Sequence, residues 1–197
     1  FFFFCLTKAK RLTDSDRVNF ELTKHLVFLI DTNITKLIFL SSFAAHGPGE
    51  EVNFTQAKVS DENKPNTAYG RSKLKAENYI NESFKGKYVI LRPTGVYGPR
   101  ETDYFVFFQT IDNHIEPYLG FVPQRLTFVY SKDLVQVCIK AFESEVSGKT
   151  YFVSDGKMYL DSEYAAISKQ ILNKKTLKLK FPLFIVKWMS SFLDMLG

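Results

Sequence analysis

The sequence predicts an α/β fold with a parallel sheet, because a strand, a helix and a second strand follow one another along the chain. The first strand, 36–42, is a short apolar run that ends in two serines. A polar stretch typical of a helix follows at 66–80, and a second apolar run, 87–93, breaks into a loop with Gly and Pro. In parallel sheets, ligands bind at the carboxyl ends of the strands. We therefore expect the functional residues at these strand ends and at the start of the helix.

Two residues of the predicted helix carry suggestive chemistry. Asn66 or Thr67 can cap the helix, and Tyr69 and Lys73 are then four residues apart on one helix face. A phenol has a pKa near ~10 and is a poor base at neutral pH, but a fixed ammonium group nearby favours the phenolate. The pair predicts a proton-transfer device in which Lys73 tunes Tyr69. The spacing alone also fits a surface helix with a half-buried tyrosine.

The neighbouring motifs favour the first interpretation. Leu40-Ser41-Ser42 precedes a loop that ends in glycine, Tyr69-x-x-x-Lys73 follows, and LRPTGVYGP (91–99) and FVYSKDL (128–134) come later. In this order the motifs resemble the extended short-chain dehydrogenases/reductases, the NAD(P)-dependent epimerase/dehydratase group, over nearly the whole chain. The resemblance implies a partial Rossmann fold, a doubly wound parallel sheet, with a small C-terminal substrate-binding subdomain. We expect residues 1–99 to form the C-terminal half of the NAD(P)-binding domain. Residues 100–197 would form a mixed substrate-binding subdomain with returning Rossmann elements.

The resemblance also implies a role for each site residue. Tyr69 would be the catalytic acid/base, Lys73 would lower its pKa and hold the nicotinamide ribose, and Ser42 would hydrogen-bond the reacting oxygen. The implied reaction is hydride transfer between a nicotinamide and a substrate alcohol or ketone, in an oxidoreductase or epimerase. The cofactor would be NAD or NADP, and Pro93, Thr94 and Val96 would line its nicotinamide pocket. The residues expected to bind the cofactor are Asn19, Ser41, Tyr69, Lys73, Pro93, Thr94 and Val96.

A second hypothesis rests on a glycine motif. Family members carry Gly-x-x-Gly-x-x-Gly near the amino terminus, where it receives the pyrophosphate, whereas the first glycine here is Gly47. The chain thus looks like a member without its first Rossmann half, and residues 1–6 are typical of the end of a buried strand. The alternative is a non-catalytic fragment or pseudoenzyme. A third hypothesis is a binding module that uses an apolar cleft as a sensor.

Two further positions bear on the substrate. His46 stands where many relatives have tyrosine, and we interpret it as a loop residue rather than a substrate contact. Many sugar-nucleotide enzymes have an arginine seven residues before Asp133. Here that position is Leu126, and Arg125 lies one place away, where a strand turns it to the other face. This register weakens the case for a sugar-nucleotide substrate.

Composition excludes several other classes. The 197 residues suit one ordinary domain, and 45% are hydrophobic, including 20 Phe, which is enough for a core. The net charge is +5, but no basic run with interleaved aromatics is present, which argues against nucleic-acid binding. Cys5 and Cys138 have no metal or redox spacing, so we predict no metal site and a reducing, cytoplasmic setting. The expected partners are a small-molecule substrate and, by the resemblance, a second copy in a homodimer.

Several further elements can be predicted. An apolar run at 104–111 predicts a helix or lid element, and alternation at 176–181 predicts a half-buried edge strand. Gly86 is expected to end the helix of Tyr69 in the left-handed conformation. The apolar residues 183–196 are too few for a membrane span, and we expect a packing helix, with contact to a membrane surface as the alternative. A helix over 14–30 is predicted by an apolar stripe of Val18, Leu22, Leu26 and Leu29.

Overall fold

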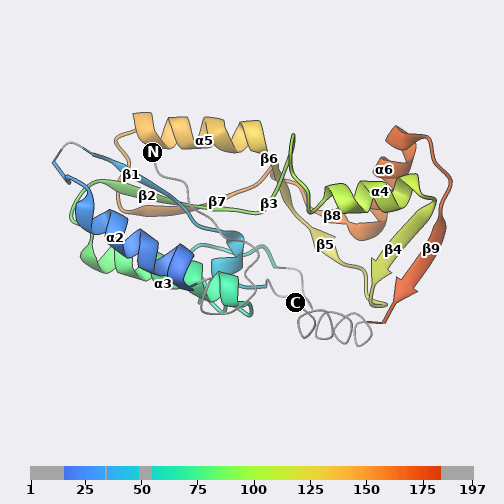
Figure 1. The fold of residues 1–197 in the computed structure, drawn as a ribbon, viewed down its shortest axis with the longest axis horizontal. Coiled ribbons are helices and arrows are strands. Elements are labelled where there is room, and N and C mark those ends of the chain that lie inside the picture. The colour runs from blue at the N-terminus through green and yellow to red at the C-terminus, as the bar shows by residue number, and fades with distance from the viewer. Residues whose placement is uncertain (1–15, 34, 49–54, 183–197) are drawn as a thin grey trace. The chain divides into compact units, whose positions relative to one another are not determined.

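A computed structural model describes residues 16–33, 35–48 and 55–182 (Figure 1). The strand predicted at 1–6 and the helix predicted at 183–196 lie outside these residues. The chain forms two compact units. The first comprises the described residues up to Thr94 together with Lys132–Ser154, and the second comprises Gly95–Ser131 and the described residues from Asp155 onward.

The first unit is a parallel sheet with helices on both faces. It is made of β1 (Leu37–Leu40), β2 (Tyr88–Pro93), β7 (Lys149–Val153), α2 (Leu22–Leu29), α3 (Ala68–Ser83) and α5 (Ser131–Glu143). The strand order is β1-β2-β7, and all pairs are parallel. The helices α2 and α3 cover one face, and α5 covers the other (Figure 1). This arrangement confirms the predicted α/β fold with a parallel sheet, since such sheets bury both faces.

The core of this unit lies between the sheet and the pair α2 and α3. Phe39 of β1 and Ile90 of β2 face the helices, and Ala76 and Ile80 of α3 are completely buried against them. Phe84, just after α3, and Val27 of α2 complete the cluster. The apolar runs predicted as strands therefore supply one wall of the core, and the second half of α3 supplies the opposite wall.

Of the helix predicted over 14–30, the described residues are helical at Arg17–Glu21 and Leu22–Leu29, but the fully buried positions are not those of the predicted stripe. Asn19 and Val27 are the buried positions, whereas Leu29 is 75% exposed. The reason is a π-helical turn at Arg17–Glu21, in which the Leu22 amide bonds to the Arg17 carbonyl. A π turn accommodates one extra residue, so the periodicity of an ordinary helix is shifted. Val18, Leu22 and Leu26 of the predicted stripe are partly buried, and the prediction was wrong for Leu29.

The end of α3 also differs from expectation. The helix ends at Ser83, and the next residue, Phe84, is extended with φ −80° and ψ 121°. Gly86 is not among the glycines with positive φ, so the prediction of a left-handed cap there was wrong. Burial of the Phe84 ring in the core accompanies the sharp departure of the chain from the helix.

The described residues of the second unit form two helices and three two-stranded pairings. Its elements are β3 (Gly95–Tyr97), α4 (Phe105–Asp112), β4 (Ile115–Leu119), β5 (Arg125–Leu126), β6 (Phe128–Tyr130), β8 (Tyr159–Leu160), α6 (Asp161–Leu172) and β9 (Leu177–Phe181). The pairs β3–β6 and β4–β9 are parallel, and β5–β8 is antiparallel. The helix predicted at 104–111 and the strand predicted at 176–181 are confirmed as α4 and β9. However, Leu177 of β9 is 68% exposed, so this strand is less buried than its alternation indicates.

A buried carboxylate links three segments of the second unit. Glu116 of β4 is 1% exposed, and it accepts hydrogen bonds of 2.7 Å from Lys169 Nζ of α6 and from Thr176 Oγ1, next to β9. The Tyr118 hydroxyl donates a third. Burial alone would raise the pKa of Glu116, but the bonds from Lys169, Tyr118 and Thr176 outweigh it and lower the pKa to about 2. The group is therefore ionised under ordinary conditions.

Candidate active site

The first turn of α3 packs directly against the turn that follows β1. Thr67 caps the helix, because its side-chain oxygen accepts a 3.0 Å hydrogen bond from the Gly70 amide, which confirms one of the two predicted caps. A Cβ atom on Gly70 would overlap the carbonyl oxygen of Ala44. Only glycine permits this approach of backbone to helix. The sequence thus places the start of α3 beside the 3₁₀ turn that begins after Ser42.

Lys73 is fully buried on α3. Its Nζ atom donates a 2.9 Å hydrogen bond to the carbonyl oxygen of Leu40, the last residue of β1. The same atom lies 5.2 Å from the centroid of the Phe39 ring and 6.0 Å from that of the Tyr69 ring. The ammonium and the phenol ring therefore share one helix face at the carboxyl edge of the sheet. A buried cation beside a phenol favours the phenolate form of that phenol.

The two serines after β1 have different surroundings. Ser42 is partly buried, and its Oγ accepts a 3.1 Å hydrogen bond from the Ala44 amide, which caps the 3₁₀ turn. Ser41 is 4% exposed, and its amide donates to the Leu91 carbonyl at 2.8 Å. Its buried Oγ has no hydrogen-bond partner among the described residues. Both hydroxyls lie where β1 ends, as the sequence predicts.

Asn19 reaches α3 from the π-helical turn. It is 1% exposed, and its Nδ2 atom donates to Ser72 Oγ at 3.2 Å. The Ser72 hydroxyl in turn donates to the Tyr69 carbonyl at 2.8 Å. Asn19 thus connects to the backbone of the helix turn that carries Tyr69. Its expected contact with a cofactor stays a prediction.

Pro93 and Thr94 follow directly from β2. Pro93 is buried and pairs with Val153 of β7, and the Thr94 amide donates to the Val153 carbonyl at 3.0 Å. Both positions are at the carboxyl edge of the sheet, together with Ser41 and Ser42. Val96 lies in β3 of the second unit, where it pairs with Val129. The structure therefore brings most, but not all, of the predicted residues to one edge of one unit.

Sequence analysis missed a buried ion pair behind this edge. Arg92 of β2 and Glu77 of α3 are 3% and 2% exposed. The Arg92 Nε atom lies 2.9 and 3.2 Å from the two oxygens of Glu77, and Nη2 lies 2.5 Å from Oε2. Arg92 Nη1 also donates to Asn63 Oδ1 at 2.9 Å. The sequence did hold one sign of this pair: Glu77 is four residues after Lys73 and therefore lies on the same face of the helix.

His46 is more buried than its interpretation as a loop residue implies. It is 5% exposed, and its ring lies against Phe43 and Phe152, at centroid distances of 5.5 and 5.3 Å. Its Nε2 atom has no hydrogen-bond partner among the described residues. The surroundings are those of a packed aromatic cluster, which agrees with a structural rather than a substrate-contacting role.

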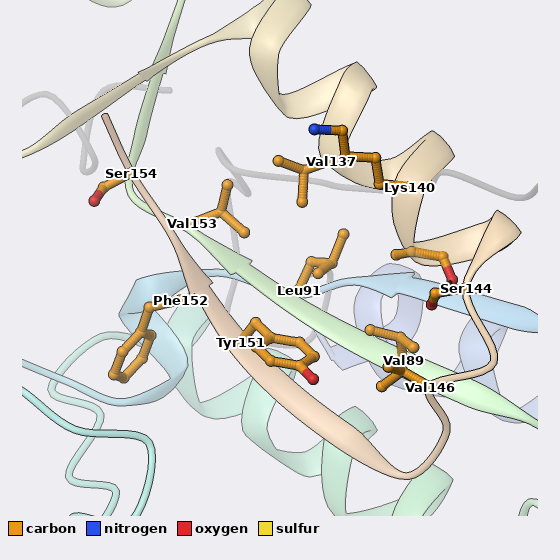
Figure 2. A pocket seen from close by; sticks show the side chains of 11 residues that line it. Val89, Leu91, Val137, Lys140, Ser144, Val146, Tyr151, Phe152, Val153 and Ser154 are labelled. Atoms are coloured by element: carbon orange, nitrogen blue, oxygen red, sulfur yellow. Dashed lines mark hydrogen bonds between the residues drawn. The ribbon is translucent and has the colours of Figure 1, made fainter. Parts of the chain in front are cut away.

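A pocket of the described structure lies away from these residues. A pocket of about 440 Å³ lies between α5 and the strands β2 and β7, on the sheet face opposite α3 (Figure 2). Val89, Leu91, Val137 and Tyr151 are among the side chains that line it, and none of the predicted site residues does.

Within the described ranges, no group of three or more His, Cys, Asp or Glu side chains could hold a metal. No helix among those residues has the length and apolarity to cross a membrane.

Comparison with known proteins shows the family of this chain. Residues 7–154 match the profile of the NAD dependent epimerase/dehydratase family, which is well over half of the chain. The chain belongs to this family. Among curated family relatives, UDP-glucose 4-epimerase of Vibrio cholerae is 28% identical over 166 residues, which are 80% of this chain and 50% of that protein. The chain therefore spans about half the length of that relative.

Several solved structures of similar fold are epimerases. UDP-N-acetylglucosamine 4-epimerase from Methanobrevibacter ruminantium M1 superposes with a TM-score of 0.77 at 23% identity, over 90% of this chain and 61% of that one. UDP-glucuronic acid 4-epimerase from Bacillus cereus, solved in complex with NAD, gives 0.77 at 19% identity, over 91% and 61%. At these identities the likeness shows the shared fold of the family.

Proposed function

We propose that the protein is an NAD(P)-dependent oxidoreductase or epimerase that acts on a substrate alcohol or ketone. The observation that carries this proposal is the buried ammonium of Lys73, held by the Leu40 carbonyl beside the Tyr69 ring at the carboxyl edge of the sheet. Ligands of parallel sheets bind at this edge. Family membership supports the same conclusion.

In this proposal, Tyr69 moves the proton. Its phenolate oxygen accepts the proton of the substrate hydroxyl in the oxidising direction and returns it in the reducing direction. The positive charge of Lys73 stabilises the phenolate, so that this transfer occurs near neutral pH. Ser42 donates a hydrogen bond to the reacting oxygen. Its Oγ already accepts from the Ala44 amide, and a hydroxyl that accepts there can still donate its own proton.

The residues at this edge fit the nicotinamide end of a dinucleotide. When bound, that cofactor would supply the hydride acceptor and donor. Lys73 would hold the ribose, and the buried hydroxyl of Ser41, which lacks a partner among the described residues, is a polar group that a ligand contact would satisfy. NAD and NADP are both compatible with these groups. The remaining proposed contacts are Asn19, Tyr69, Pro93, Thr94 and Val96.

We propose a nucleoside diphosphate sugar as the first substrate class to test. The curated relative is a UDP-glucose 4-epimerase, and solved structures of similar fold include epimerases in complex with UDP sugars. In β5, Arg125 is exposed and Leu126 is partly buried, so the one-residue offset noted in the sequence persists in the strand. Phosphate recognition would therefore differ from the pattern with arginine at position 126. We also propose a homodimer, on the family resemblance, and a cytoplasmic location, on the spacing of Cys5 and Cys138.

The alternative is a non-catalytic protein that keeps the fold. It is favoured by one observation: none of the ten glycines stands in a Gly-x-x-Gly-x-x-Gly pattern, which would anchor the pyrophosphate on a helix end. A protein of this kind would keep the side chains of Tyr69 and Lys73 but would not catalyse a reaction.

Titration calorimetry decides between the two. NAD(H) and NADP(H) are titrated separately into this chain and into the full product of its gene, with Y69F and K73M variants of each. We expect the full product to bind one of the two cofactors, Y69F to bind it without turnover, and K73M to bind it more weakly. If neither protein binds either cofactor, the enzyme proposal fails and the non-catalytic alternative stands. Binding of a cofactor by this chain, without any further residues, would show that the glycine turn is dispensable.

A further inference from the structure

The sheet-facing side of α3 carries two buried groups of opposite charge. Lys73 and Glu77 are four residues apart and are 0% and 2% exposed. Residues with this spacing lie one above the other on a helix, and opposite charges there attract. The attraction is strong in a buried environment, because little solvent screens it. The carboxylate of Glu77 could therefore compete with the Tyr69 phenolate for the ammonium of Lys73.

The structure shows Glu77 fully engaged elsewhere. Its two oxygens accept three hydrogen bonds of 2.5–3.2 Å from the Nε and Nη2 atoms of Arg92, and within the described residues Arg92 supplies every bond it accepts. The guanidinium is held in turn, because Nη1 donates to Asn63 Oδ1 at 2.9 Å and the carbon Cζ lies 5.8 Å from the Phe152 ring centroid. A planar guanidinium matches a carboxylate at two points, which an ammonium cannot do.

Two adjacent strands therefore hold the two charges of α3. Leu40 and Leu91 are paired across β1 and β2, and Arg92 follows Leu91 directly. The Leu40 carbonyl receives Lys73, while Arg92 receives Glu77 one helical turn further on. A buried ion pair is weak evidence for a gain in stability, because apolar side chains of similar volume often replace such a pair without loss.

We propose that Arg92 is a positioning residue, which occupies both oxygens of Glu77 and so keeps this carboxylate from drawing Lys73 away from Tyr69. The inference rests on the proposed role of Tyr69 and Lys73, and it deepens that role. Arg92 touches neither Tyr69 nor Lys73 in any bond described above. It acts on the site through Glu77.

The test compares a single variant with its own suppressor. R92M leaves Glu77 buried without its partner, and we expect the carboxylate to take up Lys73. The double variant R92M/E77L removes the competitor as well, so Lys73 should return to its wild-type position. R92K keeps the positive charge but cannot bond both oxygens of Glu77 as the guanidinium does. It replaces R92M in the test if R92M does not fold. The control E145Q breaks an exposed ion pair of the same unit, Lys87–Glu145.

The readout is the titration of the Tyr69 phenol, followed by NMR of ¹³Cζ-labelled tyrosine and assigned with Y69F. We expect the titration midpoint to rise by about one pH unit in R92M or R92K, since the stabilising charge moves away. It should return to the wild-type value in R92M/E77L, whatever the melting temperatures of the variants. A purely structural role for Arg92 would instead make the midpoint follow thermal stability.

Two outcomes would overturn the inference. One is an unchanged midpoint in folded R92K and R92M, and the other is a double variant shifted as far as the single one. The measurement needs neither cofactor nor turnover. A failure of the cofactor titration would therefore refute the proposed function and leave the Arg92 result to be judged separately.

Discussion

The buried carboxylate of the second unit offers the sharpest quantitative prediction. Glu116 is held by Lys169, Thr176 and Tyr118, which lower its pKa from an ordinary 4.5 to about 2. At about 1.36 kcal/mol per pKa unit, this difference corresponds to roughly 3 kcal/mol of stabilisation when the group is ionised. Because the folded pKa is the lower one, this stabilisation is complete above pH 4.5. It is lost as the pH falls toward 2.

The substitution E116Q keeps the shape of the side chain and removes its charge. We expect it to lower the free energy of unfolding of this unit by about 3 kcal/mol at pH 7. The variant should also lose the acid-dependent decline that the wild type shows between pH 4.5 and 2. Urea unfolding at pH 7, 4.5, 3 and 2 measures both, with the amide NMR signals of β4 and β9 reporting on the unit that contains Glu116.

A matched control comes from the first unit. E145Q removes the same charge from an ion pair whose side chains are 63% and 88% exposed, and exposed pairs of this kind contribute little. Its unfolding free energy should stay within about 0.5 kcal/mol of the wild type. If wild type and E116Q instead lose stability in parallel as the pH falls, the Glu116 network does not titrate as its hydrogen bonds indicate, and the reasoning is refuted.

Three further predictions concern α3. T67A should lower the free energy of unfolding by about 1 kcal/mol through loss of the cap, whereas T67S should not; equal losses in urea titrations would contradict the capping role. G70A should cost about 1–3 kcal/mol, because its methyl group overlaps the Ala44 carbonyl, and an unchanged melting temperature would disprove this close contact. K73M in the full gene product should reduce turnover about 10²- to 10⁴-fold without lowering the melting temperature, since the lost charge is buried; retained turnover would remove Lys73 from the mechanism.

The start of α3 could be predicted from the sequence because its determinants are local. The Thr67 cap bonds an amide three residues away, and the shared face of Tyr69 and Lys73 follows from helical spacing alone. The family motifs likewise identified the α/β fold, which the structure confirms. The division of the chain at residue 99 and the individual roles of the site residues stay predictions.

Contacts between distant residues defeated the same approach elsewhere. The buried face of α2 depends on a π turn whose Asn19 meets Ser72, 53 residues further along the chain. Gly86 was expected to end α3, but Phe84 enters the core and turns the chain earlier. Arg92 lies in a quoted motif, yet its partner Glu77 is on another element. No local sequence pattern indicates which buried charged residue pairs with which other one.

The buried residues of α3 also separate along the helix, and this separation has a consequence for the site. Toward its start the helix buries Ser72 and Lys73, which contact Asn19 and the Leu40 carbonyl through hydrogen bonds. Toward its end it buries Ile80 in the apolar core. Hydrophobic burial, which is the main stabilising contribution to folding, therefore comes from the second half. The first half is held by directional polar contacts, which contribute less to stability but fix position. Substitution of Lys73, which holds its place through such a polar contact, should accordingly alter the titration and chemistry of Tyr69 more than it alters unfolding.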